Sequence, residues 1–167
     1  MACLGVLFSI DQTTVDFIEQ LSTEQERIDY TKEVIEEDYF QNQPRWVAEL
    51  DKSWDALHRS LTDGQLAWDN GEYPLNHVIF GGKLLCANGG YIIVLKSKEQ
   101  VTEIAKAVNQ LTKRSLRARY FLLDPEEYDG EIGEEDFEYT WQWFEDSKAF
   151  WQKAAAENRS VLFTVDQ

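Results

Sequence analysis

Apolar residues recur along the chain in two patterns, short β-prone runs and longer stretches with helical spacing. Compact apolar runs at residues 3–10, 91–95 and 161–165 predict strands at the start, in the middle and at the end of the chain. Apolar residues three and four positions apart predict helices over residues 15–21, 24–40, 50–62, 98–112, 116–123 and 134–157. The pattern therefore predicts an α+β fold, a single compact domain over residues 1–167. In it, several helices, including a long C-terminal helix, cover a small mixed sheet made of the N-terminal, central and C-terminal strands.

The predicted helix at residues 50–62 has an informative face, on which Trp54, Leu57 and Leu61 accompany His58. Asp51 is the expected N-cap of this helix, because an aspartate side chain can accept a hydrogen bond from a backbone amide of the first turn. His58 is one of only two histidines in the chain. Its apolar neighbours favour a hydrogen-bonded histidine in or beside the core over a catalytic acid, base or metal ligand.

Composition indicates a folded chain in a reducing compartment. With 43% apolar and 13% aromatic residues, the 167-residue chain can form a substantial hydrophobic core. Cys3 and Cys86 each lie among apolar residues, far apart in the sequence, which favours buried free thiols. The N-terminus resembles a strand more than a signal peptide, and the longest uncharged run, residues 84–95, is too short to cross a bilayer. We therefore expect a cytoplasmic protein.

Charge narrows the classes of partner. The chain has 31 acidic and 16 basic residues, a formal net charge of −15 at pH 7. Nucleic acids and anionic membranes both attract positive surfaces, so we expect neither as a partner. An acidic protein is instead attracted to a basic protein partner over long range, and solubility alone is the other interpretation.

The most unusual segment runs from Asp124 to Asp146 and contains eleven carboxylates but no Lys or Arg. Aromatic residues are interleaved with these carboxylates. They are explained either as core residues of the long helix or as apolar anchors within a charged rim, which is the composition of a protein-binding surface. The candidate partner-binding residues are Asp124, Glu126, Glu127, Asp129, Glu131, Glu134, Glu135, Glu138, Tyr139 and Trp143.

A basic stretch precedes this segment. Residues 96–119 contain seven Lys and Arg residues but only two acidic residues, Glu99 and Glu103. In so acidic a chain, we expect these bases to pair with the protein's own carboxylates or with those of another subunit, in preference to RNA.

Sequence motifs for known sites fail on their spacing. Gly81-Gly82-Lys83 lacks the earlier glycine and the following Ser or Thr of a phosphate-binding loop, and it predicts a glycine turn instead. The run that starts at Asp124 places Gly130 one position late for a calcium-binding loop, so at most weak cation binding by clustered carboxylates is expected. No Ser, Cys or His lies in the pattern of an activated nucleophile. We therefore predict no catalytic residue, no metal site and no cofactor.

An ordered set of short segments spans nearly the whole chain: Met-Ala-Cys-Leu-Gly-Val-Leu-Phe at the start, Leu50-Asp51-Lys52-x-Trp54-x-x-Leu57-His58, Pro74-Leu75 before Gly81-Gly82, Leu116-Arg117-x-Arg119-Tyr120, and Phe150-Trp151-x-x-Ala154-Ala155. This set resembles the YfbM-like family of uncharacterised bacterial proteins. The resemblance implies a compact α+β domain with no assigned activity and no catalytic residues to transfer. The chain departs from the family pattern after Tyr120, where acidic residues 124–135 replace an Asn-rich stretch.

These observations support three hypotheses for function. The first is a non-enzymatic acidic binding protein, most specifically an immunity protein that neutralises a basic toxin, with a nuclease as the first candidate, by covering its active groove. The second is a small-molecule or enzymatic pocket near Asp51, Trp54, His58, Gly81 and Gly82. The third is a structural or regulatory homo-oligomer.

Overall fold

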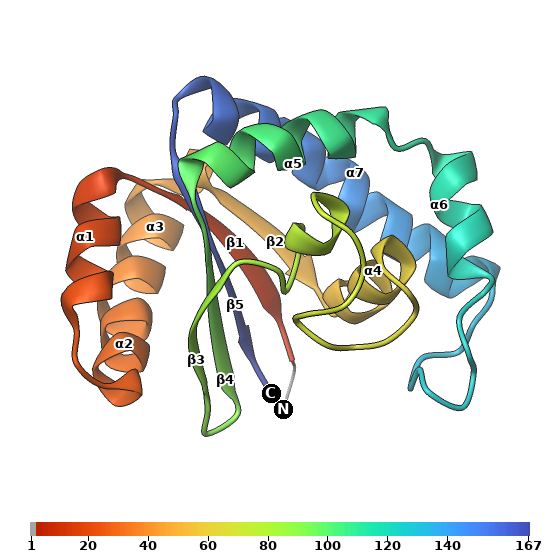
Figure 1. Cartoon of the computed structure of the whole chain (residues 1–167), viewed down its shortest axis with the longest axis horizontal. Coiled ribbons are helices and arrows are strands. Elements are labelled where there is room, and N and C mark those ends of the chain that lie inside the picture. The colour runs from red at the N-terminus through yellow and green to blue at the C-terminus, as the bar shows by residue number, and fades with distance from the viewer. Residues whose placement is uncertain (1–2) are drawn as a thin grey trace.

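The computed structural model describes residues 3–167 and contains one five-stranded sheet in the order β2-β1-β5-β4-β3 (Figure 1). The strands are β1 (Gly5–Ile10), β2 (Val47–Asp51), β3 (Lys83–Asn88), β4 (Tyr91–Lys96) and β5 (Ser160–Asp166). All neighbouring strands are antiparallel, so the α+β class is confirmed but the expected mixed sheet is corrected to an antiparallel one. The first and last strands run in opposite directions at the centre of the sheet, where Gly5 pairs with Val165.

Helices cover both faces of this sheet (Figure 1). One face carries α1 (Gln12–Gln20), α2 (Glu24–Tyr30) and α3 (Glu37–Asn42), and the other carries α4 (Trp54–Leu61), α5 (Lys98–Gln110), α6 (Lys113–Tyr120) and α7 (Glu134–Ala156). A π-helical turn, Thr31–Glu36, joins α2 to α3 without a break. Short 3-10 turns lie at Pro44–Trp46 and Leu75–His77. The predicted long C-terminal helix is α7, which has 23 residues.

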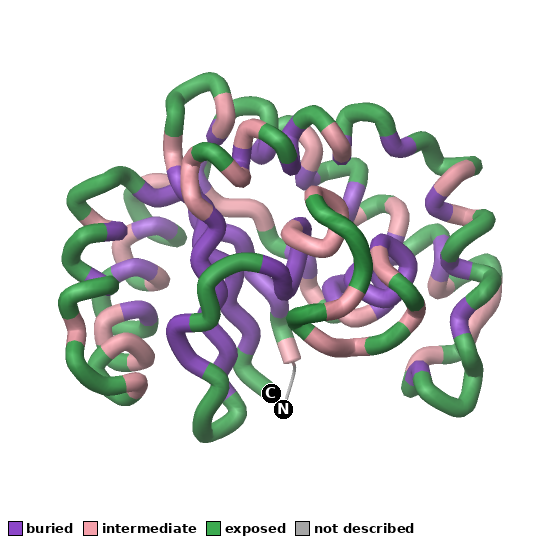
Figure 2. Tube along the Cα trace, viewed as in Figure 1, coloured by how far each residue is buried: buried purple, intermediate pink, exposed green. Residues whose placement is uncertain are grey.

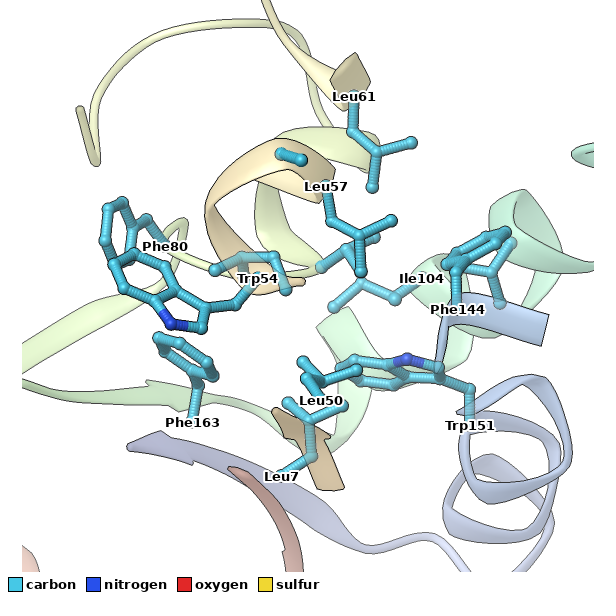
Figure 3. Packing of buried hydrophobic residues seen from close by; sticks show 14 of the residues in the cluster. Leu7, Leu50, Trp54, Leu57, Leu61, Phe80, Ile104, Phe144, Trp151 and Phe163 are labelled. Atoms are coloured by element: carbon cyan, nitrogen blue, oxygen red, sulfur yellow. The ribbon is translucent and has the colours of Figure 1, made fainter. Parts of the chain in front are cut away.

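Alternate residues of the central strands divide between two hydrophobic clusters. Phe8 faces the cluster under α1–α3, whereas Leu7 faces the cluster under α4–α7. The central strands are therefore buried along almost their whole length (Figure 2). In the second cluster, the ring of Trp54 lies 5.6 Å from that of Phe80 and 6.2 Å from that of Phe163, between ring centroids (Figure 3). These rings fix the start of α4 against the sheet.

The start of α4 differs from the sequence prediction. Leu50 and Asp51 are the last two residues of β2, and Asp51 has a φ of 49°, so it is not the N-cap. Ser53 occupies that position, and its hydroxyl donates to the Leu50 carbonyl at 2.6 Å. Because β2 turns almost directly into α4, Leu50 and Trp54 keep a four-residue spacing without sharing a helix.

Candidate protein-binding surface and adjoining cavity

The acidic segment forms an exposed surface between α6 and α7. We define the acidic surface as the loop of residues 121–133 together with residues 134–139 at the start of α7. In Figure 1 this loop extends from the end of α6 at the lower right, away from the sheet, and returns to α7. The exposed members of the predicted partner-binding set are Asp124, Glu126, Glu127, Asp129, Glu131, Glu134, Glu135, Glu138 and Tyr139, whereas Trp143 is half-buried.

Two of these carboxylates have basic partners within the chain. Lys113 Nζ lies 2.6 Å from Glu138 Oε2, and the Arg117 guanidinium makes a two-point contact with the Glu134 carboxylate. These pairs confirm that part of the basic stretch at residues 96–119 pairs with the protein's own carboxylates. Within residues 3–167, no ion pair is made by the other six carboxylates, Asp124, Glu126, Glu127, Asp129, Glu131 and Glu135.

Two buried tyrosines hold the loop in place. The hydroxyls of Tyr120 and Tyr128 both donate to Asp136 Oδ2, at 2.5 and 2.9 Å. Burial, together with the neighbouring Asp136 carboxylate, raises the pKa of both phenols, so both remain protonated donors at neutral pH. Gly130 lies so close to the Tyr128 ring that a Cβ at this position would be 2.4 Å from the ring. The loop therefore presents its carboxylates from a packed and hydrogen-bonded base.

Apolar side chains are exposed at the edge of the same surface. Leu122 is 84% exposed and Phe121 is 39% exposed, where α6 ends and the loop begins. The Arg117 guanidinium lies 4.7 Å from the centre of the Phe121 ring. Adjacent apolar side chains within a charged rim have the composition of a protein-binding surface.

A cavity of about 560 Å³, which we call the aromatic cavity, opens beside the acidic surface. Its lining residues include Trp54 from α4, Tyr128 and Asp129 from the loop, and Asp136 and Tyr139 from α7. The cavity therefore joins Trp54, from the second predicted site, to residues of the acidic surface.

His58 is a buried, hydrogen-bonded core residue, as its apolar neighbours predicted. It is 1% exposed, and its ring lies 4.9 Å from that of Phe80 between centroids. Because both of its hydrogen-bond partners are acceptors, Nε2 carries the proton and donates to Ala67 O at 2.6 Å and Asn70 Oδ1 at 2.8 Å. Burial lowers the pKa of His58, which favours the neutral ring. His58 does not line the aromatic cavity.

Gly81 and Gly82 form the predicted turn, and a buried lysine holds it. Gly82 has a φ of 132°, a conformation that favours glycine, and the Gly81 amide donates to Asn76 O at 2.8 Å. Lys96, at the end of β4, is 0% exposed, and its ammonium group donates to Ile79 O and, at 2.7 Å, to Gly81 O. Burial lowers the pKa of Lys96. The basic stretch was predicted to pair with carboxylates, whereas the acceptors of Lys96 are backbone carbonyls in the core.

Asp51 lines a smaller cavity of about 270 Å³, together with Glu36 and Tyr91. The Tyr91 hydroxyl donates to Glu36 Oε1 at 2.5 Å, and burial raises the pKa of Glu36. Nothing in the sequence spacing indicated this pair, because Glu36 lies in the π-helical turn and Tyr91 begins β4. The residues of the second predicted site therefore do not converge on one pocket.

The remaining sequence expectations concern the cysteines and the membrane. Cys86 is buried as predicted, whereas Cys3 is only partly buried and lines the aromatic cavity. Among residues 3–167, every helix is too short or too polar to cross a lipid bilayer.

Comparisons with known proteins identify a family and a fold. The model of a family described as a domain of unknown function, DUF1877, matches residues 1–164. The crystal structure of YfbM from Escherichia coli, a protein of unknown function, is similar with a TM-score of 0.69 and 19% sequence identity, over 97% of this chain and 99% of that chain. At this level of identity, the similarity shows a shared fold. No curated protein matches the chain.

Proposed function

The chain belongs to the DUF1877 family, which confirms the YfbM-like resemblance but brings no assigned activity, and we propose that it is a non-enzymatic binding protein for a basic protein partner. The specific form of the proposal is an immunity protein that neutralises a toxin by covering its active groove. A nuclease is the first candidate, because a groove that binds nucleic acid carries an excess of Lys and Arg. The proposal includes a cytoplasmic location.

The observation that carries the proposal is the set of six exposed carboxylates without a basic partner among the described residues, all within or directly after the loop at residues 121–133. Charge that serves only solubility needs no clustering, since interspersed charges keep a surface soluble. A cluster of one sign instead attracts an oppositely charged surface and fixes its orientation. Leu122, 84% exposed at the edge of the cluster, supplies an apolar anchor.

The hydrogen bonds beneath the loop favour binding for a second reason. A mobile loop must be ordered when a partner binds, and this ordering weakens the affinity. Here Tyr120 and Tyr128 already connect α6 and the loop to Asp136 of α7. The carboxylates are therefore presented before the partner arrives.

The proposal is tested by titrating the purified protein with the product of the adjacent gene in a calorimeter. We expect binding at about 0.05 M salt that weakens strongly at about 0.5 M salt, because salt screens the attraction between exposed charges. Absence of binding at both salt concentrations would contradict the proposal.

A matched pair of variants distinguishes the effect of the acidic surface on binding from the effect of the protein's net charge. Glu126→Gln with Glu127→Gln removes two charges from the loop, and Glu33→Gln with Glu37→Gln removes two exposed charges from the helices on the opposite face of the sheet. We expect the loop variant to weaken binding about 3- to 30-fold and the control less than about twofold. Equal effects of the two variants would show that binding depends on net charge and not on this surface.

A further inference from the structure

We infer that the aromatic cavity receives a cationic side chain, the guanidinium or ammonium group of an Arg or Lys residue that the basic partner carries. The inference rests on the proposed function and adds to it the chemistry of one contact. A cavity of about 560 Å³ is large enough for a long side chain together with its backbone.

The cavity has aromatic walls whose polar atoms are already bonded within the protein. Trp54 Nε1 donates to Cys3 O at 2.9 Å, and the Tyr128 hydroxyl donates to Asp136. The Tyr139 hydroxyl accepts from the Lys52 amide at 3.2 Å. Trp54 and Tyr128 are only 4% and 9% exposed, so Tyr139, 37% exposed, is the aromatic residue of these walls most open to a ligand, and aromatic ring surfaces attract cations.

The carboxylates of the lining favour a positive charge. Asp129 makes no ion pair within residues 3–167, and both hydrogen bonds to Asp136 from described residues use Oδ2, which leaves Oδ1 to accept another donor. Asp55 also lines the cavity, but its charge is compensated by Arg59, whose Nε lies 2.6 Å from Asp55 Oδ1. Among the described residues of the lining, Lys52 carries the one opposing charge, and it is exposed. A guanidinium fits this lining, because it combines a flat face for the rings with several N–H donors for carboxylates.

The position of the cavity favours a side chain over a free small cation. Tyr128 and Asp129 belong both to its lining and to the loop that carries the unpaired carboxylates. A protein bound on the acidic surface therefore has the cavity within its contact area. Contacts between the bound protein and the other carboxylates of the acidic surface would position the inserted side chain. A free amine has no such additional contacts.

The cavity can be tested without the partner by using N-acetylarginine amide as a probe and N-acetylcitrulline amide as its neutral control of the same shape. Binding is followed by nuclear magnetic resonance, through the indole N–H of Trp54 and the amide of Gly130. Alkylation of Cys3 gives a second measurement, because a bound probe should slow it, while the buried Cys86 serves as an internal reference. We expect the arginine probe to bind at least about fivefold more tightly than the citrulline probe.

Variants of the lining residues test whether the arginine probe binds in the aromatic cavity. Asp129→Asn and Tyr139→Leu should each weaken binding of the arginine probe about three- to fivefold, since each removes one charge or one ring. Glu33→Gln, on the opposite face of the sheet, should leave it unchanged. Equal binding of both probes, or shifts confined to residues outside the cavity, would overturn the inference. If spermidine binds more tightly than the arginine probe, the cavity is a site for a free polyamine, and the inference is again overturned.

Failure of this inference and failure of the proposed function give different results. If the partner binds the wild-type protein and the Asp129→Asn and Tyr139→Leu variants equally, the proposed function stands and the cavity assignment is wrong. If the arginine probe binds with the expected selectivity but no basic protein does, the cavity recognises the cation and the proposed function is wrong.

Discussion

Asp136 accepts hydrogen bonds from two buried tyrosines, so its replacement by alanine should strongly destabilise the protein. Tyr120 is 0% exposed and Tyr128 is 9% exposed, and both hydroxyls donate to the same carboxylate oxygen. Asp136→Ala leaves both hydroxyl donors, on buried tyrosines, without this acceptor. A buried polar group that loses its partner costs about 1–3 kcal/mol. Two such losses give an expected destabilisation of about 2–6 kcal/mol, a large part of the roughly 5–15 kcal/mol that stabilises a typical domain.

Glu135→Ala is the matched control for this prediction. Glu135 precedes Asp136 in the first turn of α7, is exposed, and has no ion pair among the described residues. Both replacements remove one negative charge from the helix N-terminus, where it contributes about 0.3–1 kcal/mol through the helix dipole. The difference between the two variants therefore isolates the hydrogen bonds to the tyrosines.

The measurement is the free energy of unfolding in urea at pH 7, followed by tryptophan fluorescence. Hydrogen exchange of residues 124–133 adds a local measurement, since loss of the tyrosine contacts should expose the loop amides to faster exchange. If Asp136→Ala and Glu135→Ala differ by less than about 0.5 kcal/mol, the buried hydrogen bonds do not hold the loop and the reasoning is wrong.

Two further predictions concern Leu122 and Lys96. Leu122→Ser should change the free energy of unfolding by less than about 0.5 kcal/mol, because the side chain is 84% exposed, and yet weaken binding of the partner about tenfold or more in calorimetry. Burial lowers the pKa of Lys96, so the unfolded state binds more protons and wild-type stability should rise as the pH increases toward the ordinary lysine pKa of 10.5. Lys96→Met removes the titrating group, and urea unfolding across this range should show a smaller rise; an unchanged slope would exclude Lys96 as its source.

The sequence predicted the centre of the sheet and missed its edges for a physical reason. The apolar runs at residues 3–10, 91–95 and 161–165 correspond to β1, β4 and β5, which lie next to one another and are buried on both faces. Such strands appear as continuous apolar runs. The edge strands β2 and β3 are largely exposed or half-buried, with one buried residue in β2 and two in β3. Their conformation depends on pairing with β1 and β4, which a local pattern does not encode.

The site was predictable where it depends on exposure and unpredictable where it depends on the path of the chain. Carboxylates without partners are rarely buried, so a run of them indicates a surface. Tyr120 and Tyr128 lie sixteen and eight positions before Asp136, and only the fold of the loop brings them to one carboxylate oxygen. Lys96 belongs to the basic stretch that was predicted to pair with carboxylates, but its acceptors are the carbonyls of a turn fifteen or more positions earlier in the chain.

From the sequence, the acidic segment and the helix that contains Trp54 were alternative candidate sites. In the structure, residues of both line the aromatic cavity. Tyr128 connects them, because it lines the cavity and its hydroxyl donates to Asp136, which holds the loop to α7. The order of the loop and the shape of the cavity therefore depend on the same hydrogen bonds. It follows that Asp136→Ala should weaken the binding of both the arginine probe and the whole partner, whereas Leu122→Ser should weaken the binding of the partner alone.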